Sequence, residues 1–163
     1  MKLKIKKYRT EPGFVFSEAA TAIGKGLMAG AAGTLAITLS QMIEMKITKR
    51  KPSTAPADAA EKVLDIKPAT EADKQKFSQE VHWAYGTTWG LPRSIMGLLG
   101  LKGLPATVLH FATIYTSALA VPTSLKVAPP LKEWSPKEFA VDALHHAVYA
   151  VVAGLVYDAL SDD

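Results

Sequence analysis

Long uncharged stretches alternate with short segments that hold most of the charged residues of this chain. Gly26 to Ile43 is a run of eighteen residues without a charge, and Leu104 to Val121 is also uncharged. A helix needs roughly 20 predominantly apolar residues to cross a bilayer, with a lower limit of ~17. With their neighbours counted, both stretches meet this requirement. The pattern therefore favours a helical membrane protein.

Proline, serine and threonine mark where the helices begin and end. Thr70 with Asp73 resembles a capping box, and Ser135 before Pro136 with Glu138 in the first turn is a typical N-terminus. No strand-like alternation and no internal repeat is present. We therefore expect an all-α fold, with the chain forming a single membrane domain (residues 1–163) built as a four-helix transmembrane bundle. The expected helices span residues 17–48, 71–99, 104–121 and 136–160.

The second helix and the loop before it are less apolar than the rest. The helix begins in water, becomes apolar near His82 and contains Pro92, which should kink it. Arg93, beside the kink, needs a polar partner or access to the membrane interface. In the polar loop, residues 49–70, Asp58 to Ile66 is typical of a short amphipathic helix at the interface, although a soluble linker helix fits equally well.

Composition and charge narrow the class of protein further. The chain has 163 residues, 48% of them hydrophobic, with a net charge of +4 and no cysteine. Disulfides and thiolate metal sites are therefore excluded. The basic residues lie in loops without interleaved aromatic residues, so we expect contact with lipid headgroups and no nucleic-acid partner. No cleavable signal peptide is evident, because Glu11, Pro12 and Glu18 follow the N-terminal lysines.

The positive-inside rule weights the charges that lie close to the spans. It favours a cytoplasmic position for the loops at residues 49–80 and 123–136, with both termini outside.

Ionisable residues within membrane spans mark candidate functional sites, because placing them in hydrocarbon is costly. In an up-down-up-down arrangement, most of these residues lie near one membrane side, and His110 lies nearer the midplane. Each helix has one polar or aromatic stripe, such as Asp142, His146 and Tyr149 at helical spacing. These stripes should face a common polar interior. The candidate residues are Glu44, His82, His110, Asp142, His145 and His146.

Several functions fit such an interior, and the residues leave them open. The six candidates could ligate a metal ion such as Zn, Fe or Mn, and Asp142 with His145 has the carboxylate-x-x-histidine spacing of di-iron bundles, although only one such motif is present. His110 and His146 could instead ligate haem. A proton or small-ligand pathway and simple structural pairing are further alternatives. No nucleotide-binding loop or other familiar enzyme motif occurs, so an enzyme is not expected.

Adjacent helical residues point about 100° apart, so His145 and His146 cannot both face one site. Asp142 with His146 is the better-matched pair, which leaves His145 to face a neighbouring helix or another subunit.

Gly26 and Gly30 form a small-xxx-small pair in the first helix. Small residues allow helices to approach closely in lipid. This face could dock a helix of another subunit, which would make the chain a structural part of a larger membrane complex without a ligand. A soluble helical bundle with a ligand cavity is a second alternative.

Several segments together resemble a group of small, uncharacterised bacterial membrane proteins, and more loosely the YagU-type inner-membrane proteins. The segments are an HWAYG..WG stretch from His82 to Gly90, a Leu-His pair at His110, and a D..HH.VY helix from Asp142 to Tyr149. The resemblance covers most of the chain. It implies a multi-pass protein of the bacterial inner membrane and transfers no catalytic residue.

Overall fold

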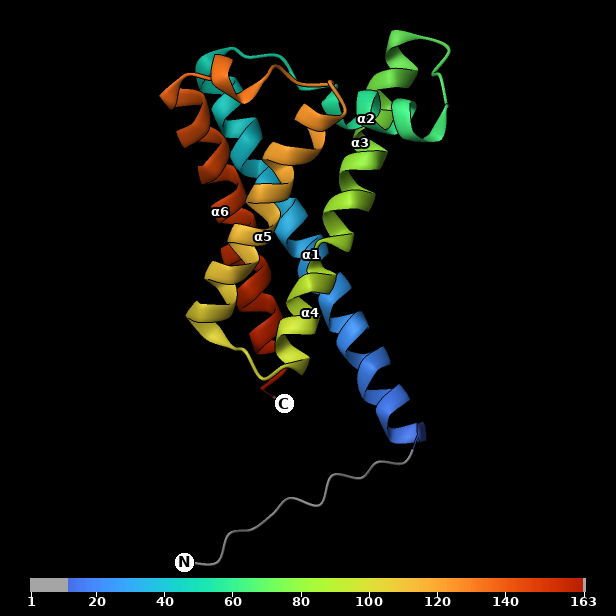
Figure 1. The fold of residues 1–163 in the computed structure, drawn as a ribbon, viewed down its shortest axis with the longest axis vertical. Coiled ribbons are helices and arrows are strands. Elements are labelled where there is room, and N and C mark those ends of the chain that lie inside the picture. The colour runs from blue at the N-terminus through green and yellow to red at the C-terminus, as the bar shows by residue number, and fades with distance from the viewer. Residues whose placement is uncertain (1–11, 163) are drawn as a thin grey trace, which may run out of the picture.

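The computed structural model describes residues 12–162, and this part of the chain consists of helices and loops without any strand. Figure 1 shows the helices running back and forth along the long axis of the molecule. The elements are α1 (Pro12–Thr48), α2 (Ala55–Leu64), α3 (Glu71–Thr88), α4 (Gly90–Leu98), α5 (Gly103–Ser124), the short 3-10 helix η1 (Leu131–Glu133) and α6 (Pro136–Ala159).

Helix α1 is the centre of the packing. It packs against α6, α4 and α3, whereas α5 packs mainly on α6 and α2 packs on α3. The ends of α1 and α5 and the starts of α3 and α6 lie at one end of the molecule, which we call the α2 end (Figure 1). The end of α4, the start of α5 and the end of α6 lie at the opposite end, which we call the α4 end. The expected up-and-down course of the chain is therefore confirmed.

Three helices are long and apolar enough to cross a membrane: Phe16–Thr48, Gly103–Ser124 and Pro136–Ala159. Many of their large apolar side chains point outward, among them Leu39, which is 51% exposed, and Leu155, which is 67% exposed. Contiguous exposed apolar surface marks a face that another apolar phase covers. The prediction of an all-helical chain is confirmed for the described residues, and three of the helices have the length and composition of membrane spans.

The predicted helix starts follow from local capping. The Thr70 hydroxyl accepts a hydrogen bond from the Asp73 amide at 3.1 Å, and α3 begins at the next residue. Ser135 and Glu138 form a complete capping box at the start of α6.

Helix α1 begins five residues earlier than expected. Helix α5 continues to Ser124, past the expected stop at Pro122, because a proline in the last turn removes a single backbone hydrogen bond.

The expected second helix is interrupted. Helix α3 ends at Thr88 and α4 begins at Gly90, so Trp89 forms a joint between two shorter helices. Pro92 explains this position, because its nitrogen carries no hydrogen to donate to the Thr88 carbonyl four residues earlier. The prediction of one kinked helix over residues 71–99 is wrong in this respect. Because of the interruption, α4 has only nine residues, and α3, with 18 residues, is too polar to be a candidate span by itself.

The short helix in the loop is present, three residues earlier than predicted, and it is held by ion pairs. The Lys74 ammonium on α3 lies 2.6 Å from the Asp58 carboxylate of α2 and 3.6 Å from Glu61. The hydrogen bond to Asp58 raises the pKa of Lys74 above its ordinary value.

The N-terminal lysines and Glu11, which entered the predictions about orientation and the signal peptide, lie outside the described residues.

Candidate functional site

Small residues bring α1 into close contact with the α3–α4 joint. A Cβ atom added to Gly30 would overlap the Thr87 carbonyl, and one added to Gly90 would overlap the Gly26 carbonyl. Glycine is therefore required where these backbones meet. The Gly26/Gly30 face packs against this chain's own helices, and so it does not offer a free surface for the helix of a partner.

The α2 end of the bundle holds most of the candidate residues. A hydrogen bond of 2.8 Å joins His145 Nδ1 to the Ser40 hydroxyl of α1, so His145 faces a neighbouring helix. His146 Nδ1 donates to the Asp142 backbone carbonyl at 2.8 Å and lies 3.5 Å from the Asp142 carboxylate. Glu44 lies farther out and pairs with Arg50 at 2.8 Å.

Between the two ends of the bundle, side chains of α3, α5 and α6 form hydrogen bonds to α1 and to the region of the α3–α4 joint. His82 Nε2 lies 3.0 Å from the Thr38 hydroxyl, and that hydroxyl donates to a backbone carbonyl of its own helix, so His82 is the donor to Thr38. The Tyr149 hydroxyl donates to the Gly86 carbonyl at 2.6 Å. His110 Nε2 donates to the Trp89 carbonyl at 2.8 Å. Polar side chains of α5 and α6 thus bind backbone carbonyls at the joint.

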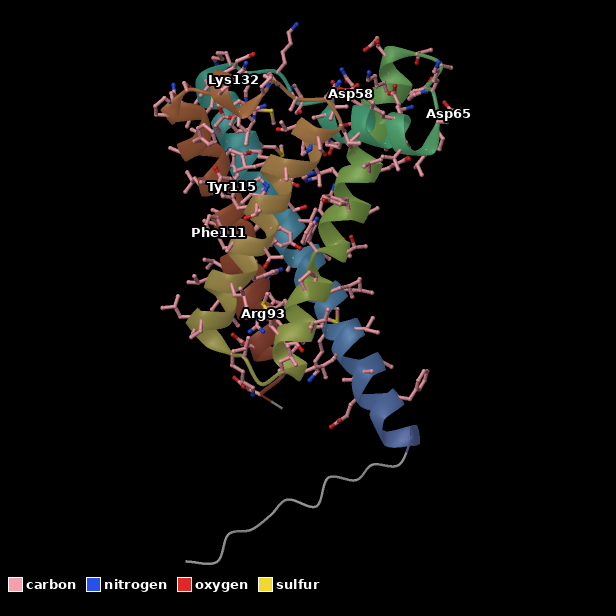
Figure 2. The ribbon with its side chains drawn as sticks, in the orientation of Figure 1. Asp58, Asp65, Arg93, Phe111, Tyr115 and Lys132 are labelled. Carbon is pink, nitrogen blue, oxygen red and sulfur yellow. The ribbon has the colours of Figure 1, made fainter. Side chains whose placement is uncertain are left out.

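A buried ion pair closes the α4 end. Arg93 is fully buried and pairs with Asp158 of α6, and its guanidinium lies 4.7 Å from the centre of the Tyr157 ring. Figure 2 shows Arg93 near this end of the bundle. The Leu101 carbonyl accepts a hydrogen bond from Arg93 at 3.4 Å, and the Gly103 amide donates to the Asp158 carboxylate at 3.2 Å. The expectation that Arg93 needs a polar partner is met by these contacts.

Two imidazole nitrogens are buried and have no hydrogen-bond partner within residues 12–162. They are Nδ1 of His110, a residue with no exposed surface, and Nε2 of His145, a residue with 4% exposure. The Trp89 carbonyl can only accept, so His110 Nε2 carries a hydrogen. In the neutral ring the lone pair therefore lies on Nδ1. Each of these histidines thus has one nitrogen bound to the protein and one free.

The candidate residues are close to one another at the α2 end, except for His110, which lies at the α3–α4 joint. In the described part of the chain, no three histidine or carboxylate side chains form a group suited to a metal ion. His110 packs against Tyr149, with ring centres 6.0 Å apart, and His146 packs against Tyr115, at 5.7 Å. The two rings proposed as haem ligands therefore each contact a tyrosine of the facing helix. Within residues 12–162 the six candidate residues therefore do not form a metal site of three or more ligands.

Some polar residues of the interior were not recognised in the sequence. Ser40 and Asp158 were missed, and Tyr149 was placed on the interior stripe without a role. Asp158 has a recognisable signal, because it is a carboxylate near the end of the last helix, on the side where Arg93 requires a partner. Ser40 has none, because serine is common in membrane helices.

These observations define the class of protein as a helical protein with three candidate membrane spans and a polar interior. Comparison with protein-family models, with curated proteins and with solved structures finds no match for this chain.

Proposed function

We propose that the chain is a multi-pass protein of the bacterial inner membrane in which α3 and α4 together form a fourth crossing. The course of the chain supports this proposal, because α1 ends at the α2 end and α5 begins at the α4 end (Figure 1). If both helices cross the bilayer, the intervening chain must cross it as well. The 28 residues from Glu71 to Leu98 rise by ~42 Å, which exceeds a hydrocarbon core of about 30 Å.

Single-cysteine labelling tests this topology cleanly, because the natural chain has no cysteine. A cysteine in place of Ser53 should react with a membrane-impermeant maleimide only after the inner membrane is opened, and one in place of Gly100 should react in intact spheroplasts. Labelling of both positions from the same side would contradict a fourth crossing. Recovery of the protein in the cytosolic fraction would favour the soluble bundle instead.

We further propose that the polar interior conducts protons across the membrane. The observation that carries this proposal is the pair of buried histidines, His110 and His145, each with one engaged and one free ring nitrogen. Imidazole can accept a proton on one nitrogen and release one from the other, which makes histidine suited to proton relays. A metal site is less well supported, because no three of the candidate ligands within the described residues form a group suited to a metal ion.

The proposed proton path follows α6. Asp142 and Asp158 are sixteen residues apart, which corresponds to ~24 Å along the helix. Between them lie His145, His146 and Tyr149, and the Tyr149 ring contacts His110. Asp158 is 24% exposed at the α4 end and provides the second opening of the path. Because the Asp158 carboxylate pairs with Arg93, the positive charge of the guanidinium is neutralised and repels a proton less.

A structural subunit without a ligand is the alternative function, and a specific observation favours it. His82 and His145 each form a hydrogen bond to α1, and His110 forms one to the Trp89 carbonyl at the α3–α4 joint. Interhelical hydrogen bonds in membranes contribute on average about 0.6 kcal/mol each. In this view the histidines hold the helices together, and their free nitrogens have no role.

Two isosteric substitutions separate the alternatives. His110→Gln retains a donor in the position of Nε2, and His145→Asn retains a polar atom in the position of Nδ1, while both remove the group that can take up a proton. The purified protein would be placed in liposomes that contain a pH-sensitive dye, and internal acidification would be followed after an external pH step. We expect the natural chain to acidify the lumen faster than empty liposomes, and both variants to lose this activity with nearly unchanged melting temperatures.

Ser94→Ala is the matched control, because it removes a buried hydrogen bond to α1 without removing an ionisable group. It should retain proton flux. Flux equal to that of empty liposomes, or full flux in both histidine variants, would refute conduction and leave the structural role.

A further inference from the structure

A shallow, open depression of about 510 Å³ lies along one exposed face of α5, beside Trp89 of the α3–α4 joint. We call it the α5 groove. Its lining consists of Trp89 and one face of α5, formed by Ala112, Thr113, Thr116, Ser117, Ala120 and Val121.

The length of the α5 groove matches one leaflet of a bilayer. From Ala112 to Val121 the helix rises by ~14 Å. The hydrocarbon core of a bilayer is about 30 Å thick, so one leaflet contributes about half of it. The groove begins beside Trp89, at the joint in the middle of the bundle, and extends toward the α2 end. It therefore has the depth that one lipid acyl chain occupies.

The lining is uncharged, which suits an apolar occupant. The Thr113 hydroxyl donates to the Leu109 carbonyl of its own helix at 2.8 Å, so its hydrogen is already bound. Threonine then presents a methyl group, and the alanines and Val121 add further apolar surface. The groove lies within a candidate membrane span, and in the membrane placement proposed above it opens toward hydrocarbon.

Two lysines lie where α5 reaches the polar surface. The Lys62 ammonium of α2 donates to the Leu125 carbonyl at 2.6 Å, directly after the last residue of α5, and the exposed Lys126 follows in the chain. The neighbouring acids Asp58 and Glu61 are paired with Lys74.

Asp65 and Lys67, which line the same surface as Lys62, oppose each other in sign. Lys62 and Lys126 are thus the cations that a lipid phosphate would meet above the groove.

We propose that the α5 groove binds the acyl chain of an anionic phospholipid, whose phosphate contacts Lys62 and Lys126. The bound lipid would cover this face of α5 beside Trp89 and hold α2 against the end of α5. This inference depends on the membrane placement proposed above and is independent of proton conduction. Failure of the membrane placement would appear separately, in the cysteine-labelling experiment.

Native mass spectrometry of the full chain in detergent tests the proposal, with phosphatidylglycerol and phosphatidylcholine as probes. We expect one phosphatidylglycerol to remain bound per chain and phosphatidylcholine to be lost more readily. Ala120→Trp should fill the groove and abolish retention. Lys62→Gln and Lys126→Gln should each weaken it on the order of fivefold, since a basic residue at the membrane surface contributes that factor.

Matched controls are available on the same helix and at the same end of the molecule. Val108→Trp adds the same ring at a position that is 57% exposed and outside the groove. Lys132→Gln removes a charge at the α2 end on the opposite side from Asp58 and Asp65 (Figure 2). Both should retain the lipid.

Three results would overturn the proposal: equal retention of the two lipids, unchanged retention in both lysine variants, or a dimer of this chain that Ala120→Trp dissociates. The lysine variants lie on the surface, so they decide the outcome even if Ala120→Trp fails to fold.

Discussion

Removing the charge of Asp158 should destabilise the bundle more than removing Arg93. Arg93 has no exposed side-chain surface, whereas Asp158 is 24% exposed. In Asp158→Asn a buried guanidinium loses its counter-ion, and breaking a buried pair in this way costs about 3–5 kcal/mol. In Arg93→Met the remaining carboxylate lies near the surface and keeps its hydrogen bond from the Gly103 amide. The loss should therefore be smaller in Arg93→Met.

The double variant Arg93→Met with Asp158→Leu provides the third arm of the comparison. Replacing a buried pair by apolar residues of similar size is often neutral or stabilising. The double variant should therefore be more stable than Asp158→Asn. Such a result would assign the cost to the unpaired charge and not to lost packing.

The assay is thermal unfolding in detergent, followed by tryptophan fluorescence. For a chain of this length a change of 1 kcal/mol shifts the melting temperature by about 2–4 °C, so a cost of about 3–5 kcal/mol should lower the melting temperature of Asp158→Asn by about 6–20 °C. Lys102→Gln is the control, because its ion pair with Asp162 is exposed and such pairs contribute less than about 1 kcal/mol. The reasoning is refuted if Asp158→Asn melts like the natural chain, or if Arg93→Met is the less stable of the two.

Four further substitutions test the packing and the caps by the same unfolding assay. Gly30→Ala should lower the melting temperature clearly, because the added methyl group overlaps a backbone carbonyl of α3. Gly24→Ala places its methyl group where no atom lies within 4 Å. It should raise the melting temperature slightly, because alanine favours the helix over glycine by about 1 kcal/mol. Tyr149→Phe loses the hydrogen bond to the joint and should cost about 0.5–1.5 kcal/mol. Ser135→Ala removes the cap of α6 and should cost about 1 kcal/mol, and an unchanged melting temperature would contradict the capping role.

The helices were predictable because their signals are local. Apolar runs, the Thr70 and Ser135 caps and the proline in the second helix each act over a few residues, and the corresponding elements are present. Pro92 predicts a disturbance of the helix near Trp89, but it does not predict whether the helix bends or breaks there. Pro92 alone would allow a kink within one helix, whereas the chain ends one helix and begins another.

The partners of the interior residues were less predictable, because they depend on how the helices rotate against one another. Periodicity placed His145 and His146 on different faces, and the structure gives them Ser40 and Asp142 as partners. No local pattern indicates that Ser40 of α1 meets a residue 105 positions later in the chain. The prediction that the polar stripes face inward could be made from the cost of polar groups in lipid, but the pairs within the interior could not.

The joint between α3 and α4 connects the stability of the bundle with its proposed chemistry. Pro92 interrupts the helix, and the Gly86 and Trp89 carbonyls at the joint accept hydrogen bonds from Tyr149 and His110. Because a carbonyl can only accept, this contact assigns the hydrogen of the neutral His110 ring to Nε2 and leaves Nδ1 as the basic nitrogen. The contact that braces the joint therefore also prepares His110 to take up a proton, so bracing and proton transfer are compatible roles of the same residue.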